Sequence, residues 1–383
     1  MKIAYKYRLY PNQEQKVFLH KNMGCSRFVY NQMLANRKSL YEEYKQVKEK
    51  YDNYRDYLIK NDLYELKPSH LKKEFEWLKE VDSLALCNAE LNLNTAYRNF
   101  FRDVSVGYPK FKKKISHQKY KTNNQKSSID IEVNNKIAYI KLPKLKNNKI
   151  KLKYHRPIPK NRIIKSATIE RKPCGTYYIS ILVEQVSKDK LPTSKNKIGI
   201  DVGLKDFAIT SNKDKISNPK FLRKSEKKIK KLQRSVSRKK LKSNNRNKAR
   251  LKLAKAYEKV NHQKQDFLHK LTSKMINENQ VIVIEDLAIK NMVKNHKLAK
   301  AIHEVSWYRF REMLAYKCEW YGRKLIVAPK KYASSQLCSN CETKNPKVKN
   351  LSVREWTCDY CHMTHDRDIN ASKNLLKLAN SCQ

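Results

Sequence analysis

Four apolar residues, Val281 to Ile284, run unbroken into the acid Glu285 after a long basic stretch. A short run made only of β-branched residues is typical of a strand that is buried on both faces of an α/β sheet. Ligand-binding and catalytic groups in open α/β sheets gather at the carboxyl ends of the strands. The sequence therefore predicts a functional carboxylate at Glu285, and the other groups of the site must lie beside it.

The charge of the chain indicates a polyanionic partner. Its 383 residues include 85 Lys and Arg against 36 Asp and Glu, a formal net charge of +49. Nucleic acid is the natural partner of such an excess, because each neutralised phosphate releases a counterion. A hydrophobic fraction of 40% excludes a disordered chain. No run approaches 18 apolar residues and the first ten residues do not resemble a signal peptide, so we expect a soluble, intracellular protein that does not bind membranes.

The first third of the chain predicts one strand and then a helical region. Residues 2–10 alternate between basic or small residues and apolar ones, the period of a half-buried strand. Asn12 and Gln15 have the spacing of a capping box that opens a helix. The helical region ends near residue 103. Beyond it, residues 107–114 alternate lysines with aromatic rings, a pattern that suits single-stranded nucleic acid.

Short strands separated by Gly, Pro and Asn are predicted within residues 128–184, at 129–133, 137–142, 150–154, 163–170 and 177–183. Together with the N-terminal strand they suggest a small antiparallel barrel into which the helical region is inserted. A polar linker is expected at 187–197.

A hairpin is predicted next, from residues 198–203 and 207–210. Gly199, Asp201 and Gly203 share one face of its first strand, and the two glycines leave room for metal and phosphate beside the acid. Basic helices follow at 221–279 with a break near 243–245. Either a bound polyanion orders them, because like charges weaken an isolated helix, or they form a solvated helical hairpin. A further helix is expected at 307–321 and a further buried strand at 324–328.

Two C-x-x-C pairs near the C-terminus, Cys338 with Cys341 and Cys358 with Cys361, are separated by sixteen residues. This spacing is typical of a four-cysteine zinc ribbon, whose closed shell of thiolates makes the Zn²⁺ structural. Glu342 and His362 follow the second and fourth cysteines, at positions where ribbons often use glycine for a positive φ. The other five cysteines are expected to be inert thiols: Cys25, Cys87, Cys174, Cys318 and Cys382.

A third candidate acid follows the ribbon. Asp366 is a plausible N-cap, and Asp368 then shares one helical face with Ala371 and Leu375. If that face packs on the sheet, Asp201, Glu285 and Asp368 converge. Three such carboxylates suit two Mg²⁺ ions and phosphodiester hydrolysis. Arg367 contacts either phosphate or a neighbouring acid.

These motifs resemble those of the TnpB family, transposon-encoded RNA-guided nucleases similar to type V CRISPR effectors. The resemblance rests on residues 5–11, 107–111, 199–203, 283–287 and 366–371 and on the paired cysteines. It implies an α+β multidomain protein with a wedge-like barrel (1–10 and 115–190), an inserted helical recognition region (11–114) and a RuvC or ribonuclease H-like domain (197–333 and 362–383) interrupted by a zinc ribbon (334–361). The family's metal-binding acids fall on Asp201, Glu285 and Asp368.

The expected activity is Mg²⁺-dependent cleavage of double-stranded target DNA, directed by a guide RNA from the transposon end and by a short adjacent motif that the protein reads. Such a protein is expected in the cytoplasm of a prokaryote, associated with the nucleoid. Two alternatives remain at this stage. One is a guide-dependent repressor that does not cut, and the other is a transposase or accessory transposition protein that acts on DNA without a guide. The sequence leaves open whether one chain or two make up the working particle.

Overall fold

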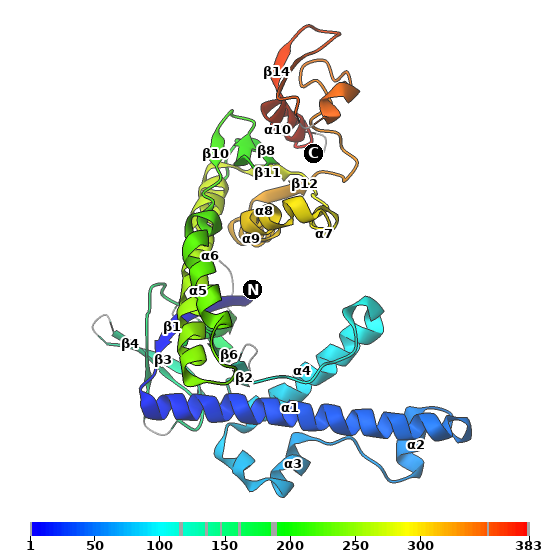
Figure 1. Cartoon of the computed structure of the whole chain (residues 1–383), viewed down its shortest axis with the longest axis vertical. Helices are drawn as coiled ribbons and strands as arrows, with labels where there is room; N and C mark the ends of the chain where they lie inside the picture. Colours follow the sequence, from blue (N-terminus) through cyan, green and yellow to red (C-terminus); the bar gives the residue numbers. More distant parts are fainter. Residues whose placement is uncertain are drawn as a thin grey trace. The chain divides into compact units, whose positions relative to one another are not determined.

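The computed structural model describes residues 2–114, 118–134, 137–145, 148–159, 162–184, 190–350 and 352–380. The chain divides into two compact units, residues 1–187 and 188–383, which can be followed by colour in Figure 1. The linker predicted at 187–197 begins among residues that lie outside the described part. No helix in the described ranges is long and apolar enough to cross a membrane.

The N-terminal unit is built on a seven-stranded antiparallel sheet. The alternation in its first strand is confirmed, since Ile3, Tyr5, Tyr7 and Leu9 are buried and the residues between them are exposed. The strands are β1 (Lys2–Tyr10), β2 (Gln118–Asn123), β3 (Asp130–Asn134), β4 (Ile137–Lys141), β5 (Ile150–Leu152), β6 (Ile163–Arg171) and β7 (Tyr177–Glu184).

The prediction of a closed barrel is wrong, because this sheet is open. Its strand order is β2-β6-β7-β1-β5-β4-β3, and the two edge strands do not pair with each other in the described ranges. Helices α1 and α4 pack against β2 instead, so the inserted helical region is the neighbour of that edge strand. Strand β2 was not predicted, since five of its six residues are polar and carry no apolar alternation.

The predicted helical region is confirmed. Asn12 Oδ1 accepts a hydrogen bond from Gln15 N–H at 2.8 Å, and Gln15 Oε1 accepts one from Asn12 N–H at 3.0 Å. This capping box begins a helix of 35 residues, whose apolar face packs against α4 around Val29, Met33 and Leu93. The helices are α1 (Gln13–Val47), α2 (Tyr54–Lys60), α3 (Pro68–Glu74) and α4 (Ser83–Arg102), with 3₁₀ turns at η1 (Lys48–Lys50), η2 (Glu76–Glu80) and η3 (Val104–Val106).

The C-terminal unit contains a mixed five-stranded sheet in the order β10-β9-β8-β11-β12. Strands β8 and β9 form the predicted hairpin and β10 extends it, all antiparallel. Strand β11 is parallel to β8 on one side and to β12 on the other. The strands are β8 (Lys197–Val202), β9 (Asp206–Thr210), β10 (Lys215–Ser217), β11 (Val281–Ile284) and β12 (Lys324–Val327), with a separate two-stranded sheet of β13 (Glu355–Thr357) and β14 (Thr364–Asp366).

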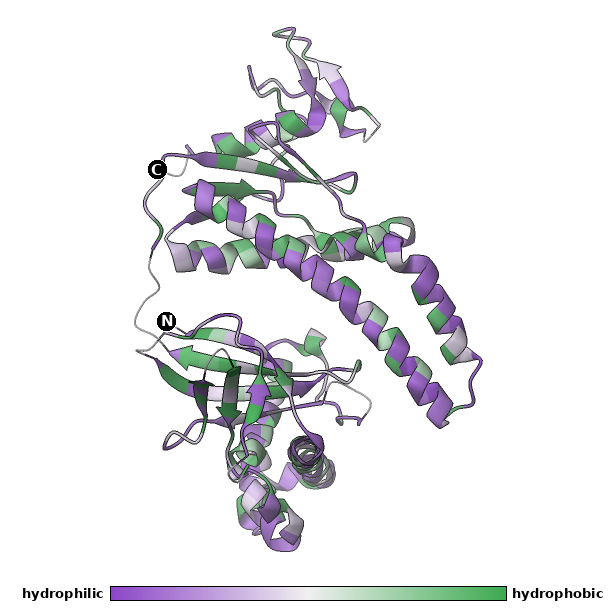
Figure 2. Ribbon diagram, turned by 90° about the vertical axis from the view of Figure 1, so that its left-hand side faces the viewer, coloured by the Kyte–Doolittle hydropathy of each residue, from purple (hydrophilic) through white to green (hydrophobic). Residues whose placement is uncertain are grey.

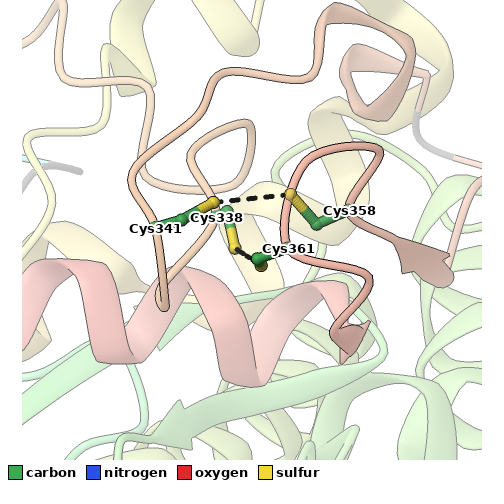
Figure 3. A group of neighbouring side chains, drawn as sticks. All are labelled: Cys338, Cys341, Cys358 and Cys361. Carbon is green, nitrogen blue, oxygen red and sulfur yellow. Dashed lines mark hydrogen bonds between the residues drawn. The ribbon is translucent and has the colours of Figure 1, made fainter.

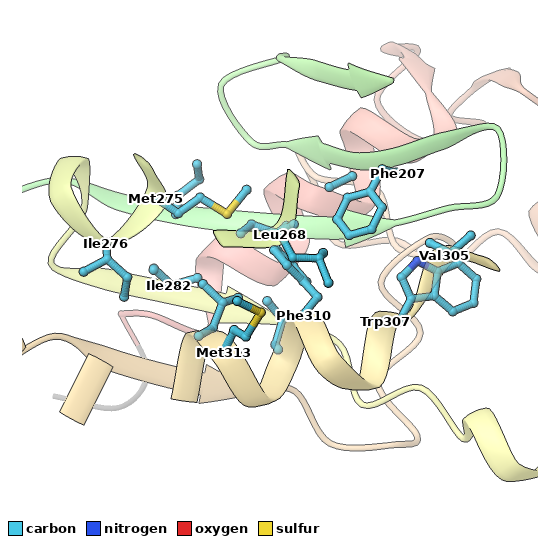
Figure 4. Close-up of a cluster of buried hydrophobic side chains, with 14 of the residues drawn as sticks. Phe207, Leu268, Met275, Ile276, Ile282, Val305, Trp307, Phe310 and Met313 are labelled. Atoms are coloured by element: carbon cyan, nitrogen blue, oxygen red, sulfur yellow. The ribbon is translucent and has the colours of Figure 1, made fainter. Parts of the chain in front are cut away.

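Helices cover both faces of the five-stranded sheet, so β11 is buried as predicted. On one face, Ile282 and Ile284 pack with Leu268, Phe310 and other residues of three helices, as Figure 4 shows. On the other face, Val283 packs with Leu375 and Ala379. The helices of this unit are α5 (Phe221–Ser237), α6 (Asn244–Glu278), α7 (Ile289–Met292), α8 (His296–Val305), α9 (Trp307–Tyr321), η4 (Pro346–Lys349) and α10 (Arg367–Lys377).

Strand β12 differs from the prediction of a second buried strand. Leu325 and Ile326 are only half-buried, and Val327 is 38% exposed. The reason is its position at the edge of the sheet, where β11 is its one strand neighbour in the described part.

The two long basic helices are confirmed together with the break between them. Helix α5 ends at Ser237 and α6 begins at Asn244, where the Ser243 hydroxyl accepts a hydrogen bond from Arg246 N–H at 3.1 Å. The helices pack along each other. Figure 2 shows that hydrophilic residues dominate this pair while the strands of the sheet are largely hydrophobic.

Candidate active site

The register of two parallel strands brings Asp201 and Glu285 together. In the β8 and β11 pair, Val283 lies opposite Gly199 and Ile284 lies opposite Ile200. The next residue on each strand is an acid. The two side chains are hydrogen-bonded to each other. Two acids that are 84 positions apart in the sequence therefore form one pair at the carboxyl edge of the sheet.

Gly199 brings the third acid to the same place. A Cβ atom on Gly199 would lie 2.1 Å from the backbone oxygen of Ser372, so α10 packs directly on the strand at this glycine. Asp368 lies one helical turn before Ser372, at the end of the helix nearer Asp201. The prediction that Gly199 leaves room for metal is wrong, because the helix backbone fills that space. The glycine instead allows the close packing that positions Asp368.

The three acids influence one another strongly. Burial raises the pKa of Asp201 well above its usual value, and the negative charges of Glu285 and Asp368 raise it further, while Arg367 partly opposes them. Burial also raises the pKa of Glu285, an effect that its hydrogen bond with Asp201 reduces. Neighbouring carboxylates in a low-dielectric site repel each other unless a proton or a cation neutralises them. The cluster is thus suited to bind cations.

Asp368 also has a partner within the protein. An Arg354 guanidinium nitrogen lies 3.5 Å from a carboxylate oxygen of Asp368. In the described part of the chain, only the four cysteines have ligand atoms that all lie within 4.8 Å of one another, so the acids form a looser group. Arg354 was not predicted as a site residue, since a single arginine between two cysteine pairs looks like any basic surface residue.

Of the two roles considered for Arg367, the structure does not support pairing with a neighbouring acid, and contact with phosphate stays a prediction. Its side chain is buried, at 8% exposure, and one guanidinium nitrogen donates to the backbone oxygen of Asn350 at 3.4 Å. No ion pair involves it among the described residues. Its remaining effect on the site is electrostatic, because its charge lowers the pKa of the nearby Asp201.

The N-cap prediction for Asp366 is confirmed. Its Oδ1 accepts hydrogen bonds from the N–H groups of Asp368 and Ile369, both at 3.0 Å. Its other oxygen accepts from Lys215 Nζ at 2.7 Å. These contacts fix the first turn of α10, which is the turn that carries Asp368.

The four cysteines of the predicted ribbon converge. Cys338 Sγ lies 3.5 Å from Cys361 Sγ, and Cys341 Sγ lies 3.6 Å from Cys358 Sγ, and Figure 3 shows the sulfurs facing one another. Four thiolates about 2.3 Å from one Zn²⁺ would be separated by nearly these distances. Glu342 and His362 have φ values of 65° and 57°, so both adopt the positive φ that glycine usually supplies. Cys25, Cys174 and Cys318 are free and buried, Cys87 is free and exposed, and Cys382 lies outside the described residues.

The ribbon is tied to α10 by side-chain amides. Asn370 Nδ2 donates to Leu337 O at 2.7 Å, and Asn374 Nδ2 donates to Ser334 O at 2.8 Å. The His365 ring packs at a tilt against Trp356, with a ring-centroid distance of 4.9 Å, and its Nε2 lies 3.1 Å from Cys338 Sγ. The metal ribbon and the helix that carries Asp368 are therefore parts of one packed structure.

Helix α5 presents a basic groove. It has a volume of about 680 Å³ and is lined by Lys227, Lys230, Lys231, Arg234, Ser235, Arg238 and Lys239. A surface lined almost entirely by cations is a candidate site for a phosphate backbone. In the N-terminal unit, the aromatic residues of the 107–114 segment divide between two roles: Tyr108 packs on Tyr97 and Phe100, and Phe111 stays 49% exposed.

Three family models match the chain. Residues 180–296 match a model described as "Probable transposase", and residues 307–375 match "Cas12f1-like, TNB domain". Residues 1–46 match "Helix-turn-helix domain". In this structure the described residues of that last segment form β1 and the single helix α1.

Two curated proteins match nearly the whole chain. A putative RNA-guided DNA endonuclease of Streptomyces pristinaespiralis is 38% identical over 98% of this chain and 89% of its own length. The putative RNA-guided DNA endonuclease InsQ of Escherichia coli K12 is 29% identical over 97% of this chain and 91% of its own. In fold, the chain is similar to a protein from a Cas12f1-sgRNA-target DNA complex, with a TM-score of 0.63, 13% identity and 98% of both chains covered.

Proposed function

The chain belongs to the TnpB family, and we propose that it is an RNA-guided DNA endonuclease of a transposable element that hydrolyses phosphodiester bonds in a RuvC-type site. The observation that carries this proposal is the convergence of Asp201, Glu285 and Asp368 from two strands and a helix. The strand order and directions of the C-terminal sheet are consistent with a ribonuclease H-like domain.

The three acids are the proposed ligands of Mg²⁺, which prefers carboxylate oxygens. Burial raises the pKa of Asp201 and of Glu285, and the neighbouring carboxylates raise that of Asp201 further, so a divalent cation at this place would offset the cost of burying their negative charge. When bound, Mg²⁺ supplies an activated water and stabilises the leaving oxygen. Asp201 and Glu285 are held by the paired strands and Asp368 by the first turn of α10. Before the ion binds, Arg354 balances the charge of Asp368.

We assign the other parts of the chain roles in nucleic-acid binding. The sheet of residues 1–10 and 115–190 is proposed to act as a wedge, the helices of 11–114 to recognise a short motif beside the target, and residues 197–333 with 362–383 to cut. The protein then reads the adjacent motif, while a guide RNA from the transposon end reads the target by base pairing. An activity of this kind places the protein at the nucleoid.

The ribbon of 334–361 is proposed to hold a structural Zn²⁺ on Cys338, Cys341, Cys358 and Cys361. Four thiolates leave no open position for water, so this site does no hydrolysis. Its role is to support the hairpin of β13 and β14, and the latter strand leads directly into Asp366 and α10.

The test begins with the RNA that accompanies the protein. We would express the chain with its native flanking DNA, purify it at moderate salt, and sequence the bound RNA. A discrete RNA that ends in variable sequence beyond the transposon boundary is expected. That RNA then directs cleavage of matched double-stranded DNA with Mg²⁺, and Asp201→Ala binds the target without cutting it.

The outcomes separate the proposal from its alternatives. Target binding by the wild-type protein with no Mg²⁺-dependent cut would indicate a guide-dependent repressor. Heterogeneous RNA or none, with movement of a marked element by this protein alone, would indicate a transposase. Exposed Asp214 on the β9 and β10 hairpin offers a matched control, since Asp214→Ala removes one acid of the same unit and is expected to leave cleavage unchanged.

A further inference from the structure

A cavity of about 430 Å³ opens beside Glu285. Its lining includes Glu285, Leu287, Trp307, Tyr308, Arg311 and Lys330, together with other apolar side chains of the β11 end and α9. Its size lies within the range of about 300–1,000 Å³ that is usual for small-ligand sites. Of its lining residues, the roles proposed above use only Glu285.

Trp307 is a buried polar residue of the cavity wall. Its side chain is only 5% exposed, and its indole Nε1–H makes no hydrogen bond among the described residues. Figure 4 shows the ring at one end of the buried cluster, beyond Phe310. A buried tryptophan N–H normally finds an acceptor, and leaving it unpaired is unfavourable. Because this nitrogen is itself buried, the Trp307 ring must turn toward the cavity before an acceptor atom on a bound ligand can satisfy it.

The same wall attracts negative charge. Trp307 and Tyr308 form the first turn of α9, and the N-cap residue Ser306 provides no side-chain cap for that turn. The N-terminus of a helix carries a partial positive charge and free N–H groups. The charged side chains of the lining balance, since Arg311 is paired with Asp286 and Lys330 is offset by Glu285, so the start of α9 is what favours an anion at the rim. An anion is therefore favoured at the rim and a flat apolar group inside.

We propose that this cavity holds the base of one nucleotide next to the phosphodiester bond that is cut at Asp201, Glu285 and Asp368. The base lies against the apolar wall, one of its acceptor atoms receives the Trp307 indole hydrogen bond, and the Tyr308 ring, 60% exposed, covers it from the rim. The flanking phosphate lies near the start of α9. This inference rests on the proposed function, since it needs a strand whose phosphate reaches the acids.

The first arm of the test uses a series of matched target DNAs, each with one abasic site at a different position. The single-turnover cleavage rate is measured for each of them. One position beside the cut is expected to slow cleavage by roughly 5-fold to 150-fold, the range for loss of one stacked base. Tyr308→Ala is expected to slow cleavage of intact DNA. In this variant the cleavage rate should also depend less on the position of the abasic site. Trp307→Phe keeps the ring in the core and removes the donor, so it is expected to reduce discrimination among the four bases at that position.

The second arm needs neither cleavage nor a guide. Full-length protein is irradiated with a single-stranded oligonucleotide that contains 5-iododeoxyuridine, and the crosslinked peptides are identified by mass spectrometry. A crosslink at Trp307 or Tyr308 is expected, and any crosslink to Tyr308 should be lost in Tyr308→Ala. Tyr64→Ala is the matched control, because Tyr64 is also 60% exposed but lies in the other unit.

The two arms distinguish failure of this inference from failure of the proposed function. Efficient cleavage with a flat abasic profile beside the cut would overturn the base site and leave the nuclease intact. If no complex cleaves DNA, the crosslinking result alone tests whether the base site exists. Labelling confined to other regions, such as α5, would overturn the base site, and labelling at Trp307 or Tyr308 would support it even though the nuclease proposal had failed.

Discussion

The side chain of Asn370 on helix α10 accepts a hydrogen bond from the backbone N–H of Ser339 at 2.8 Å. Ser339 lies between Cys338 and Cys341, and Asn370 lies two residues after Asp368. The cysteine cluster and a proposed catalytic acid are thus joined by a single residue. Disorder in the ribbon should therefore also displace Asp368.

Removal of zinc is expected to lower cleavage more than it lowers target binding. Cys358→Ser breaks the thiolate set, loosens the Ser339 loop and shifts α10, and supporting contacts of this kind are commonly worth about 10-fold to 100-fold in activity. The measurements are zinc content and single-turnover cleavage of the same preparation. Cys87→Ser, at an exposed free cysteine, should change neither. A zinc-free protein with wild-type cleavage would contradict the coupling.

Loss of any one of the three acids is expected to abolish cleavage while the fold persists. Asp201→Asn, Glu285→Gln and Asp368→Asn keep the shape of each side chain and remove one charge. Removing one electrostatic stabiliser of a transition state commonly costs about 100-fold to 1,000-fold. Cleavage rates at several Mg²⁺ concentrations are the measurement. Full activity in any of the three variants would remove that residue from the proposed site.

Gly199→Ala should disable the site without touching an acid. The new Cβ would lie 2.1 Å from Ser372 O and 2.6 Å from Leu376 N, so the backbone of α10 must move. Overpacking of this kind costs about 1–3 kcal/mol or more. We expect a lower melting temperature and loss of cleavage. Gly24→Ala is the control, because apart from the neighbouring residues of α1 itself nothing in the described structure lies within 4 Å of the new Cβ, and it should be neutral or stabilising.

The contacts of Glu170 indicate that the stability of the N-terminal unit falls in acid. Burial alone would raise its pKa, but the hydrogen bonds and charges of Lys6 and Lys172 hold it below the usual value. A carboxyl whose folded pKa is depressed contributes stability above its unfolded pKa, about 4.3, and loses that contribution as the pH falls through the folded value. The charge of Glu170 is therefore stabilising at neutral pH and not in strong acid.

Glu170→Gln should lower the free energy of unfolding by about 0.5–1 kcal/mol at pH 7, a value discounted for the exposure of Lys6. The difference from the wild type should shrink as the pH falls below about 4. Urea unfolding at several pH values measures it, with Glu49→Gln on the exposed η1 turn as the control. A difference that stayed constant down to pH 3 would contradict this reading.

If the α5 groove binds phosphate, removing its cationic side chains should reduce the salt dependence of RNA binding. Each phosphate contact contributes about 0.7–0.9 to the slope of log affinity against log salt. The double substitution of Lys231 and Arg234 by Ala should therefore reduce the slope by about 1.5 if both contact phosphate. Lys270→Ala on α6 is the control, since Lys270 pairs with Asp266 at 2.8 Å and lies outside the groove. An unchanged slope in the double variant would leave α5 as a solvated helix.

Local sequence patterns were sufficient wherever a structure depends on near neighbours. The alternation of residues 2–10 sets the buried face of β1, and the Asn12 and Gln15 pair begins α1. The cysteine spacing brings four sulfurs together because each C-x-x-C pair is a local loop. The apolar run before Glu285 identified a buried strand from four residues, since only a strand with both faces covered tolerates that composition.

The tertiary structure decided the features that depend on residues far apart in the sequence. The N-terminal sheet stays open because helices lie against β2, and β12 is half-exposed because it is an edge strand. Arg367 is buried against the Asn350 backbone, and Arg354 reaches Asp368. The sequence by itself determined which acids and cysteines are available, because side-chain chemistry is local. Only the packing of α10 on Gly199 decided how the acids meet, because that distance is set by backbone contacts between residues more than 170 positions apart.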